Sequence, residues 1–292
     1  MTLISRKAPS TVLLTPVLLL FGAFALLPML GVVVLSFTKW DGLGSPVFAG
    51  LANWTRIGHD DLLLNAVLLS VLVMIGSWLF QTPVSLLLGV FVAGAQRYRS
   101  AMAATFFLPM LLSSVAISIM WRDMLDPNFG LFAGGGPLNQ QWLGGQTLSL
   151  ITVVFVLSWQ YIPFHVLIYQ AATRQIPKSM YESAVLDGAG RAKQFWHITL
   201  PQLRHTMVTS TTLILVGTLT SFDIVFVLTG GGPGTATRIL PLHMYLTGFS
   251  QYDMGYASAI AVVLLVSGLV ISTALVRFSG FGSMESTQEG VA

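Results

Sequence analysis

The stretch "YESAVLDGAGRAKQFWHITLP", residues 181–201, interrupts a chain that is otherwise strongly apolar. It combines acidic and basic side chains with two glycines at its centre, and long charge-free runs lie on both sides of it. Glycine readily adopts the positive φ that ends one helix and turns the chain into another. The segment therefore predicts two short helices joined by a turn, placed between apolar stretches.

Flanking residues predict where these two helices begin and end. Ser179 and Glu182 have the spacing of a capping box, so we expect the first helix from Met180 to about Asp187. The second is expected over residues 191–199, ending at Pro201 because proline cannot continue a regular helix. Together they form a helix–turn–helix elbow.

The composition of this elbow leaves two interpretations open. Its Lys and Arg side chains would suit an amphipathic connector that lies against anionic lipid. Its turn, however, is rich in alanine, serine and glycine rather than in bulky apolar residues. Small residues around a bend favour close docking of the elbow into a groove on another protein.

The overall composition excludes an ordinary soluble domain. The 292 residues are 54% hydrophobic and only 9% charged, whereas soluble domains have about 25% charged residues. The chain has no cysteine, so no disulfide or Cys-based metal site is available, and its five histidines are scattered without metal-ligand spacing. The expected fold class is an all-α polytopic membrane protein.

Six runs are long enough to cross about 30 Å of hydrocarbon as helices. The apolar run at the N-terminus is too long for the core of a signal peptide, so we expect it to be retained as the first span. These runs would form a single transmembrane domain over residues 1–292. The six expected spans are approximately 11–37, 62–96, 101–121, 148–172, 206–229 and 255–276.

The distribution of basic residues predicts the orientation of these spans. Ten basic residues lie in the segments on the same side as the N-terminus, and four lie on the other side, among six aspartates. The positive-inside rule then places both termini and the 177–205 loop in the cytoplasm. The ten are Arg6, Lys7, Arg97, Arg99, Arg174, Lys178, Arg191, Lys193, Arg204 and Arg277, and the four are Lys39, Arg56, Arg122 and Arg238.

The elbow resembles the signature loop of ABC-importer permeases, E-A-A-x-x-D-G-A followed by F-x-x-I-x-L-P. Ser183 stands where alanine is usual, and His205 stands where many members have a proline. The resemblance implies a coupling helix that seats on a cytoplasmic ATPase, although Glu182 could instead serve only its own capping box. The residues implied at this interface are Glu182, Ser183, Ala184, Asp187, Gly188 and Ala189.

A second signature lies in "SFDIVFVLTGGGPGTATRILPLHMYLTGFSQYDMGYASAIAVVL", residues 221–264. Its GGGPGT lacks the spacing and the lysine of a phosphate-binding P-loop. The pattern F-D-x-x-x-x-L-T-x-G-G-P followed by G-Y-A-x-A resembles carbohydrate-uptake ABC permeases of the maltose-transporter type. The likeness extends over the whole chain, including "FAGLANWTRI" at residues 48–57.

This resemblance implies a transport subunit rather than an enzyme. The partners would be a second six-span permease, two copies of a cytoplasmic ABC ATPase that bind ATP and Mg²⁺, and an extracytoplasmic solute-binding protein. The cargo would be a sugar or oligosaccharide, moved across the bacterial inner membrane by alternating access. We expect no cofactor, metal or catalytic residue in this chain, and no nucleic-acid partner.

A sugar site needs aromatic platforms and neutral hydrogen-bonding groups. Both are present in "LSWQYIPFH" (157–165), where Pro163 could open the helix, and in the segment 220–223. Asp223 is the one acidic residue expected within a span, and it could line the cavity or bond the end of its own helix near Gly230. The candidate cargo residues, six of them placed by the resemblance, are Leu157, Gln160, Tyr161, Phe164, Thr220, Ser221, Phe222 and Asp223.

Three alternatives remain at this point. The same machinery could carry a glycerol phosphate diester or a polyol instead of a sugar. An ion-coupled secondary transporter would need paired carboxylates within the membrane, and Asp223 alone gives little support for one. A membrane-embedded enzyme would need clustered catalytic groups, and the scattered histidines argue against it.

Overall fold

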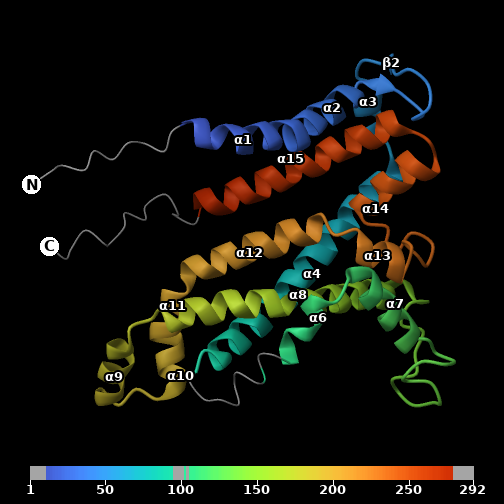
Figure 1. The fold of residues 1–292 in the computed structure, drawn as a ribbon. Coiled ribbons are helices and arrows are strands. Elements are labelled where there is room, and N and C mark those ends of the chain that lie inside the picture. Colours follow the sequence, from blue (N-terminus) through green and yellow to red (C-terminus); the bar gives the residue numbers. More distant parts are fainter. Residues whose placement is uncertain (1–10, 95–101, 103–104, 279–292) are drawn as a thin grey trace, which may run out of the picture. The chain divides into compact units, whose positions relative to one another are not determined.

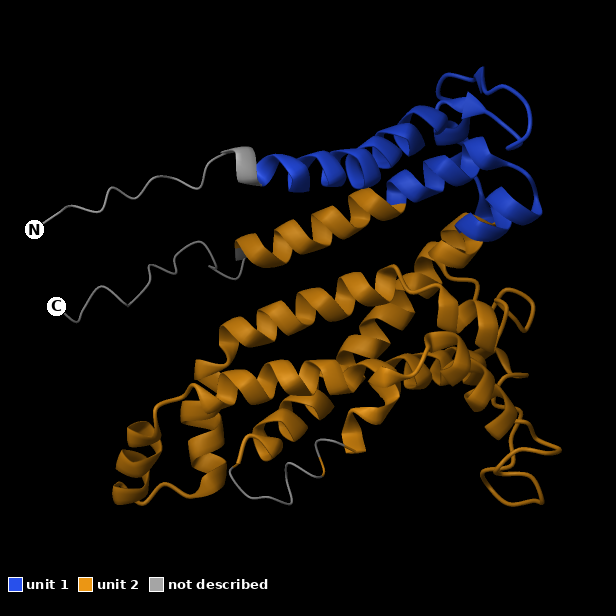
Figure 2. Ribbon diagram, viewed as in Figure 1, with its two compact units in different colours: residues 1–61, 244–263 blue, residues 62–243, 264–292 orange. Residues whose placement is uncertain are grey.

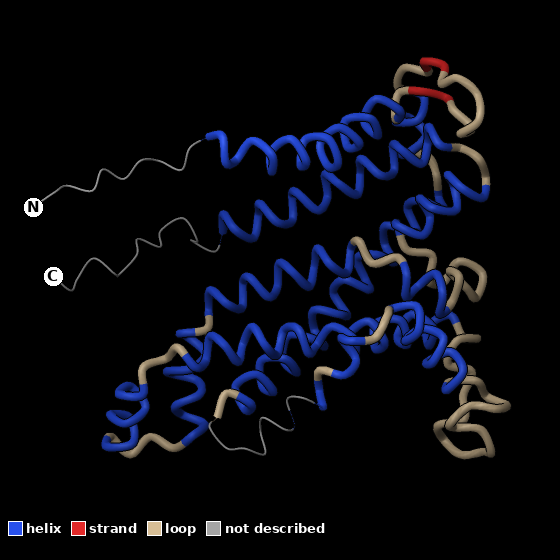
Figure 3. Tube along the Cα trace, viewed as in Figure 1, coloured by secondary structure: helices blue, strands red, loops and turns tan. Residues whose placement is uncertain are grey.

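The computed structural model describes residues 11–94, 102 and 105–278, most of which are helical (Figures 1 and 3). The chain divides into two compact units, residues 1–61 with 244–263 and residues 62–243 with 264–292 (Figure 2). Each unit combines segments that lie far apart in the sequence. The boundary between them falls inside helices, and each unit is described below by itself.

The first unit begins with an uninterrupted apolar helix. α1 (Thr11–Phe21), a π-helical turn (Gly22–Leu26) and α2 (Leu27–Leu35) follow one another directly. Pro28 explains the π turn, because its ring would clash with the carbonyl four residues earlier in a regular α-helix. The π turn avoids this clash, because its backbone hydrogen bond joins an N–H to the carbonyl five residues earlier.

A short hairpin and a helix follow in the same unit. β1 (Thr38–Lys39) pairs antiparallel with β2 (Val47–Phe48), and α3 (Ala52–Ile57) comes next. The unit is completed by a second π-helical turn (Leu246–Ser250) and the first part of α15 (Met254–Phe278). Short polar elements of this kind belong at the end of a membrane span rather than within it.

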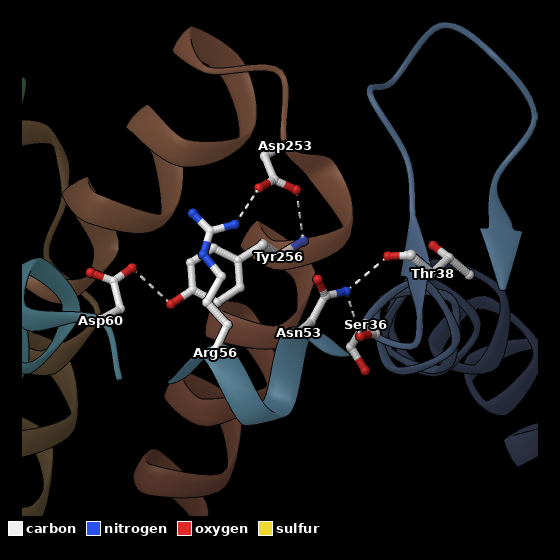
Figure 4. A network of polar contacts seen from close by, with 7 residues as sticks. All are labelled: Ser36, Thr38, Asn53, Arg56, Asp60, Asp253 and Tyr256. Carbon is white, nitrogen blue, oxygen red and sulfur yellow. Dashed lines mark hydrogen bonds and ion pairs between the residues drawn. The ribbon is translucent and has the colours of Figure 1, made fainter. Parts of the chain in front are cut away.

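A polar cluster joins α3 to the start of α15 (Figure 4). Arg56 Nη1 donates to the Asp253 carboxylate at 2.7 Å, and the guanidinium carbon lies 3.9 Å from the centroid of the Tyr256 ring. The hydroxyl of Tyr256, a fully buried residue, donates to Asp60 at 2.9 Å. One cation therefore contacts a carboxylate and an aromatic face together.

The backbone around this cluster is also held closely. Asn53 Nδ2 donates to the carbonyls of Ser36 at 2.9 Å and of Thr38 at 2.8 Å (Figure 4). Gly255 lies so near the same Thr38 carbonyl that a Cβ on it would overlap the carbonyl oxygen. The glycine of the G-Y-A-x-A motif thus permits a close backbone approach.

Two long helices form the frame of the second unit. Gly89 of α4 (Asp61–Val92) lies against Tyr169 of α8 (Gln146–Arg174), where a Cβ would come 2.5 Å from the tyrosine Cβ. A small residue at such a point lets membrane helices approach closely. The helices that pack on α8 are α6 (Leu108–Leu111), α7 (Ser114–Met124), α12 (Arg204–Leu219) and α13 (Asp223–Leu228).

Four helices in the described part of the chain are long and apolar enough to cross a membrane. They correspond to the expected first, second, fourth and sixth spans, and α8 continues through Pro163 without opening. Their bounds are Leu14–Leu35, Asp61–Val92, Gln146–Arg174 and Met254–Arg277. The helical membrane class is therefore supported, while the count of six spans stays an expectation.

The other two expected spans are not single helices. The run at 101–121 lies partly outside the described residues, and its described part is broken at Leu112 and Ser113, where the backbone is extended between α6 and α7. The run at 206–229 is broken at residues 220–222, between α12 and α13. Non-helical backbone at membrane depth is tolerated where it is buried in protein or lines a cavity.

Candidate functional site

The second unit contains a cavity of about 690 Å³, within the range of small-molecule sites. α8 supplies one wall, and the break between α12 and α13 supplies part of another. All eight candidate cargo residues line it, and the remaining lining residues come from α4, α6, α7, α8, α12 and α13. These are Gln81, Met110, Ser114, His165, Leu213, Ile214, Gly217, Thr218 and Ile224.

The break at residues 220–222 brings polar groups to the cavity. Thr220 Oγ1 donates to the carbonyls of Val216 at 3.0 Å and Gly217 at 3.2 Å, which satisfies the end of α12. The chain then resumes as α13 with Asp223 in its first turn. The C-cap residue of α13 is Thr229, whose hydroxyl lies 2.7 Å from that of Thr237.

Two buried polar pairs fix side chains on the α8 wall. Gln160 is 5% exposed and donates through Nε2 to Ser114 Oγ at 3.1 Å. His165 is also buried, and its Nδ1 lies 3.0 Å from Ser210 Oγ. Hydrogen bonds within a low-dielectric environment restrict side-chain orientation. These two hydrogen bonds therefore fix the orientation of Gln160 and His165 on this wall.

Sequence reasoning missed the contributions of α4, α6 and α7 to this wall. Gln81 could have been suspected, because an amide in a long apolar run needs a polar environment. Ser114 carried no such signal, since serine is common at helix starts. Its position depends on the break at Leu112 and Ser113, and hydropathy did not reveal that break.

Few ionisable side chains line the cavity. Asp223 is its one acidic side chain, and no lysine or arginine is among the lining residues. Over the described residues there is no group of three or more His, Cys, Asp or Glu side chains that could hold a metal ion. Apart from the imidazole of His165, hydroxyl, amide and aromatic groups make up the rest of the polar lining, and such groups can hydrogen-bond an uncharged ligand.

The elbow has a well-defined turn. Gly188 adopts φ +74°, the Gly188 N–H donates to the Val185 carbonyl at 3.0 Å, and the Ala189 N–H donates to the Ala184 carbonyl at 2.8 Å. This pair of backbone hydrogen bonds is a Schellman motif, which requires the left-handed conformation that glycine supplies. Glu182, Ser183, Asp187 and Gly188 are exposed around it.

Three details of the expected elbow are wrong. The first helix, α9, runs over Lys178–Leu186, and its N-cap position is Pro177 with no side-chain cap, so Ser179 and Glu182 form no capping box. Ser179 lies inside the helix because the chain becomes helical directly after the proline. The elbow also exposes bulky apolar side chains at the end of α9, next to the turn, since Leu186 is 89% exposed and Val185 is 62% exposed.

The third error concerns Pro201, which does not end the second helix. α10 (Arg191–Gln194) continues through a π-helical turn (Phe195–Thr199) into α11 (Leu200–Gln202). The wider turn removes the clash between the proline ring and the carbonyl four residues earlier, as at Pro28. The Tyr181 hydroxyl, 2.9 Å from that of Thr199, ties this helix back to α9.

A helical membrane protein with a polar cavity among its long helices and an exposed Schellman elbow has the features of a membrane transport subunit. A model of the family described as "Binding-protein-dependent transport system inner membrane component" matches residues 82–279. The chain belongs to this family. It is a permease component of a binding-protein-dependent ABC importer, and thus a transport subunit rather than an enzyme.

Individual relatives are similar in sequence to this chain over nearly its full length. The chain is 32% identical to the "Probable ABC transporter permease protein YurN" of Bacillus subtilis, covering 91% of this chain and 94% of the relative. It is 29% identical to the "Arabinooligosaccharides transport system permease protein AraP" of the same organism, covering 94% and 90%. A bacterial alginate ABC transporter, crystallised with an alginate pentasaccharide-bound periplasmic protein, contains a chain with TM-score 0.80, 21% identity and 94% coverage of both chains.

Proposed function

We propose that the chain imports a sugar or an oligosaccharide by alternating access, with the α8 cavity as its share of the cargo path. The observation that carries this is the set of lining residues, in which Tyr161, Phe164 and Phe222 supply aromatic surface beside neutral hydrogen-bonding groups. Such a combination suits a ring of hydroxyls with apolar faces. The cargo named for the arabinooligosaccharide relative supports the same class.

The working assembly contains a second six-span permease, two cytoplasmic ABC ATPase subunits and an extracytoplasmic solute-binding protein. The periplasmic protein crystallised with the alginate transporter supports the last of these. ATP and Mg²⁺ bind to the ATPase subunits. The chain itself has six spans with both termini in the cytoplasm, in the inner membrane that its family description names.

The elbow transmits ATPase movement to the helix bundle. Its interface comprises Glu182, Ser183, Ala184, Asp187, Gly188 and Ala189, and the exposed Val185 and Leu186 extend it. A rigid Schellman turn moves as one body, so closure of the ATPase dimer displaces the attached helices and shifts the cavity from inward-open to outward-open.

Cysteine crosslinking in the native host tests this assembly. The chain contains no cysteine, so Ser183→Cys introduces a single thiol on the exposed elbow. After purification in mild detergent, a short bifunctional maleimide should join this chain to an ATPase subunit, identified by mass spectrometry. Phe129→Cys is the control, since Phe129 is 92% exposed in a loop that the expected topology places outside. Equal crosslinking at both positions, or at neither, contradicts the proposal.

A further inference from the structure

The charge of the cavity has a consequence for which cargo can enter it. Asp223 is exposed toward the cavity that it lines, and no ion pair joins it to another residue in the described part of the chain. An unpaired carboxylate projects its field into the adjacent space, and low-dielectric walls strengthen that field. The lining has no lysine or arginine to offset it.

We propose that Asp223 is a specificity-determining residue that repels anionic cargo. The cavity then accepts uncharged polyhydroxy compounds and rejects sugar acids and phosphate esters. Discrimination of this kind works by placing an unfavourable interaction against the wrong ligand rather than by adding contacts to the right one. The inference rests on the proposed function, because it takes the cavity to be the cargo path.

The remaining polar lining is consistent with this selectivity. Gln81 and Gln160 present amides, while Ser114, Thr218 and Ser221 present hydroxyls. These groups exchange hydrogen bonds with hydroxyls, and they carry no net charge to compensate a carboxylate or a phosphate. An anion entering the cavity would lose hydration and find no lysine or arginine in the lining, where the one imidazole, that of His165, is buried against Ser210.

A thiol reporter measures the electrostatic effect without knowledge of the natural cargo. Gly217 lines the cavity, and a Cβ on it would meet nothing within 4 Å, so Gly217→Cys places the chain's single thiol there. In the assembled transporter, we would compare modification rates with cationic methanethiosulfonate ethyltrimethylammonium and with the anionic ethylsulfonate. Each rate is divided by the rate of that reagent with 2-mercaptoethanol.

The cationic reagent should react faster, and Asp223→Asn should reduce the ratio of the two rates by about tenfold, the effect of removing one nearby charge on two oppositely charged probes. Asp223→Glu keeps the charge and should leave the ratio within about twofold. Asp123→Asn is the control, because Asp123 is exposed at the end of α7, where it lies 3.6 Å from Arg122, and does not line the cavity.

An unchanged ratio in Asp223→Asn, or an equal fall in Asp123→Asn, overturns the proposal. So does failure of both Gly217→Cys and a second reporter, Ser221→Cys, to react, since the cavity would then be closed to aqueous solutes. A parallel arm measures protection of the reporter by maltotriose and by trigalacturonate. Maltotriose should protect the unaltered cavity, and trigalacturonate should protect at least fivefold better after Asp223→Asn.

The reagent-rate ratio tests the role of Asp223, and trisaccharide protection tests the proposed carbohydrate cargo, so the two proposals can fail separately. If the reagent ratio falls in Asp223→Asn while neither trisaccharide protects, the charge filter stands and carbohydrate cargo is wrong. If maltotriose protects but the ratio does not move, the cargo class stands and the role of Asp223 is wrong. Equal protection by both trisaccharides before mutation contradicts the selectivity directly.

Discussion

At the scale of single residues, Gly255 offers a test of the first unit that is independent of transport. A Cβ at this position would overlap the Thr38 carbonyl oxygen, which is fixed by Asn53. We expect Gly255→Ala to destabilise the protein by about 2 kcal/mol and to lower its Tm by several degrees, because backbone atoms cannot move aside as a flexible side chain can. Differential scanning fluorimetry of the detergent-purified protein measures this.

Gly268→Ala is the matched control on the same helix. A Cβ there would meet nothing within 4 Å, and alanine favours a helix interior by roughly 0.5–1 kcal/mol over glycine. The control should therefore keep or slightly raise the Tm. Similar losses in both variants would show that α15 is sensitive to any added methyl group and that the close approach at Thr38 is unimportant.

Single residues also show which parts of the cavity lining sequence reasoning anticipated and which it did not. The eight residues expected on the path lie together around one cavity, because they come from α8 and from the segment 220–223, which leads into α13, and α13 packs on α8. Gln81 and Ser114 were not anticipated. Their helices meet the cavity only through tertiary packing and through a helix break that hydropathy does not reveal.

At the scale of elements, the elbow depends on one backbone conformation. Gly188 has φ +74° and Gly190 has φ −70°, and a Cβ on either would meet nothing within 4 Å. Gly188→Ala thus isolates the conformational cost, about 1–2 kcal/mol for an L-residue in the left-handed region. We expect it to reduce ATP-driven uptake and Ser183→Cys crosslinking severalfold, whereas Gly190→Ala should leave both nearly unchanged.

If the turn conformation is needed for docking, Gly188→Ala must lower both uptake in reconstituted vesicles and crosslink yield. A loss of uptake with normal crosslinking would mean that the turn acts after docking. Equal effects of the two alanine variants would mean that the left-handed conformation is irrelevant and that any residue change in the turn disturbs the interface.

The elements themselves were predictable to different degrees. Uninterrupted apolar runs identified four long helices within a few residues, since length and hydropathy alone determine that a helix can span a bilayer. The breaks at Leu112 and Ser113 and at residues 220–222 were missed, because the serine and threonine residues there are uncharged and do not interrupt the charge-free runs from which the spans were predicted. Pro201 was misjudged for a different reason, since a π turn can absorb the proline ring within a helix.

At the scale of the whole molecule, Leu186 tests whether the elbow is an assembly surface. Its side chain is 89% exposed at the end of α9, so packing within the described part of the chain does not account for it. In the proposed elbow interface, this side chain would fill a hydrophobic pocket on the ATPase. We expect Leu186→Asp to reduce the ATPase that co-purifies in mild detergent by at least about tenfold, because a buried, unpaired carboxylate costs more than about 1.4 kcal/mol.

Phe129→Asp makes the comparison decisive, since Phe129 is 92% exposed in a loop away from the elbow. Both variants add one negative charge in place of an exposed apolar side chain, so general effects on insertion or solubility should be alike. Retention of the ATPase in Phe129→Asp and its loss in Leu186→Asp would locate docking at the elbow. Equal retention would leave the elbow's basic residues facing lipid, as in the amphipathic connector that its composition also allows, and ATPase coupling would then have to reach the helices through another cytoplasmic segment.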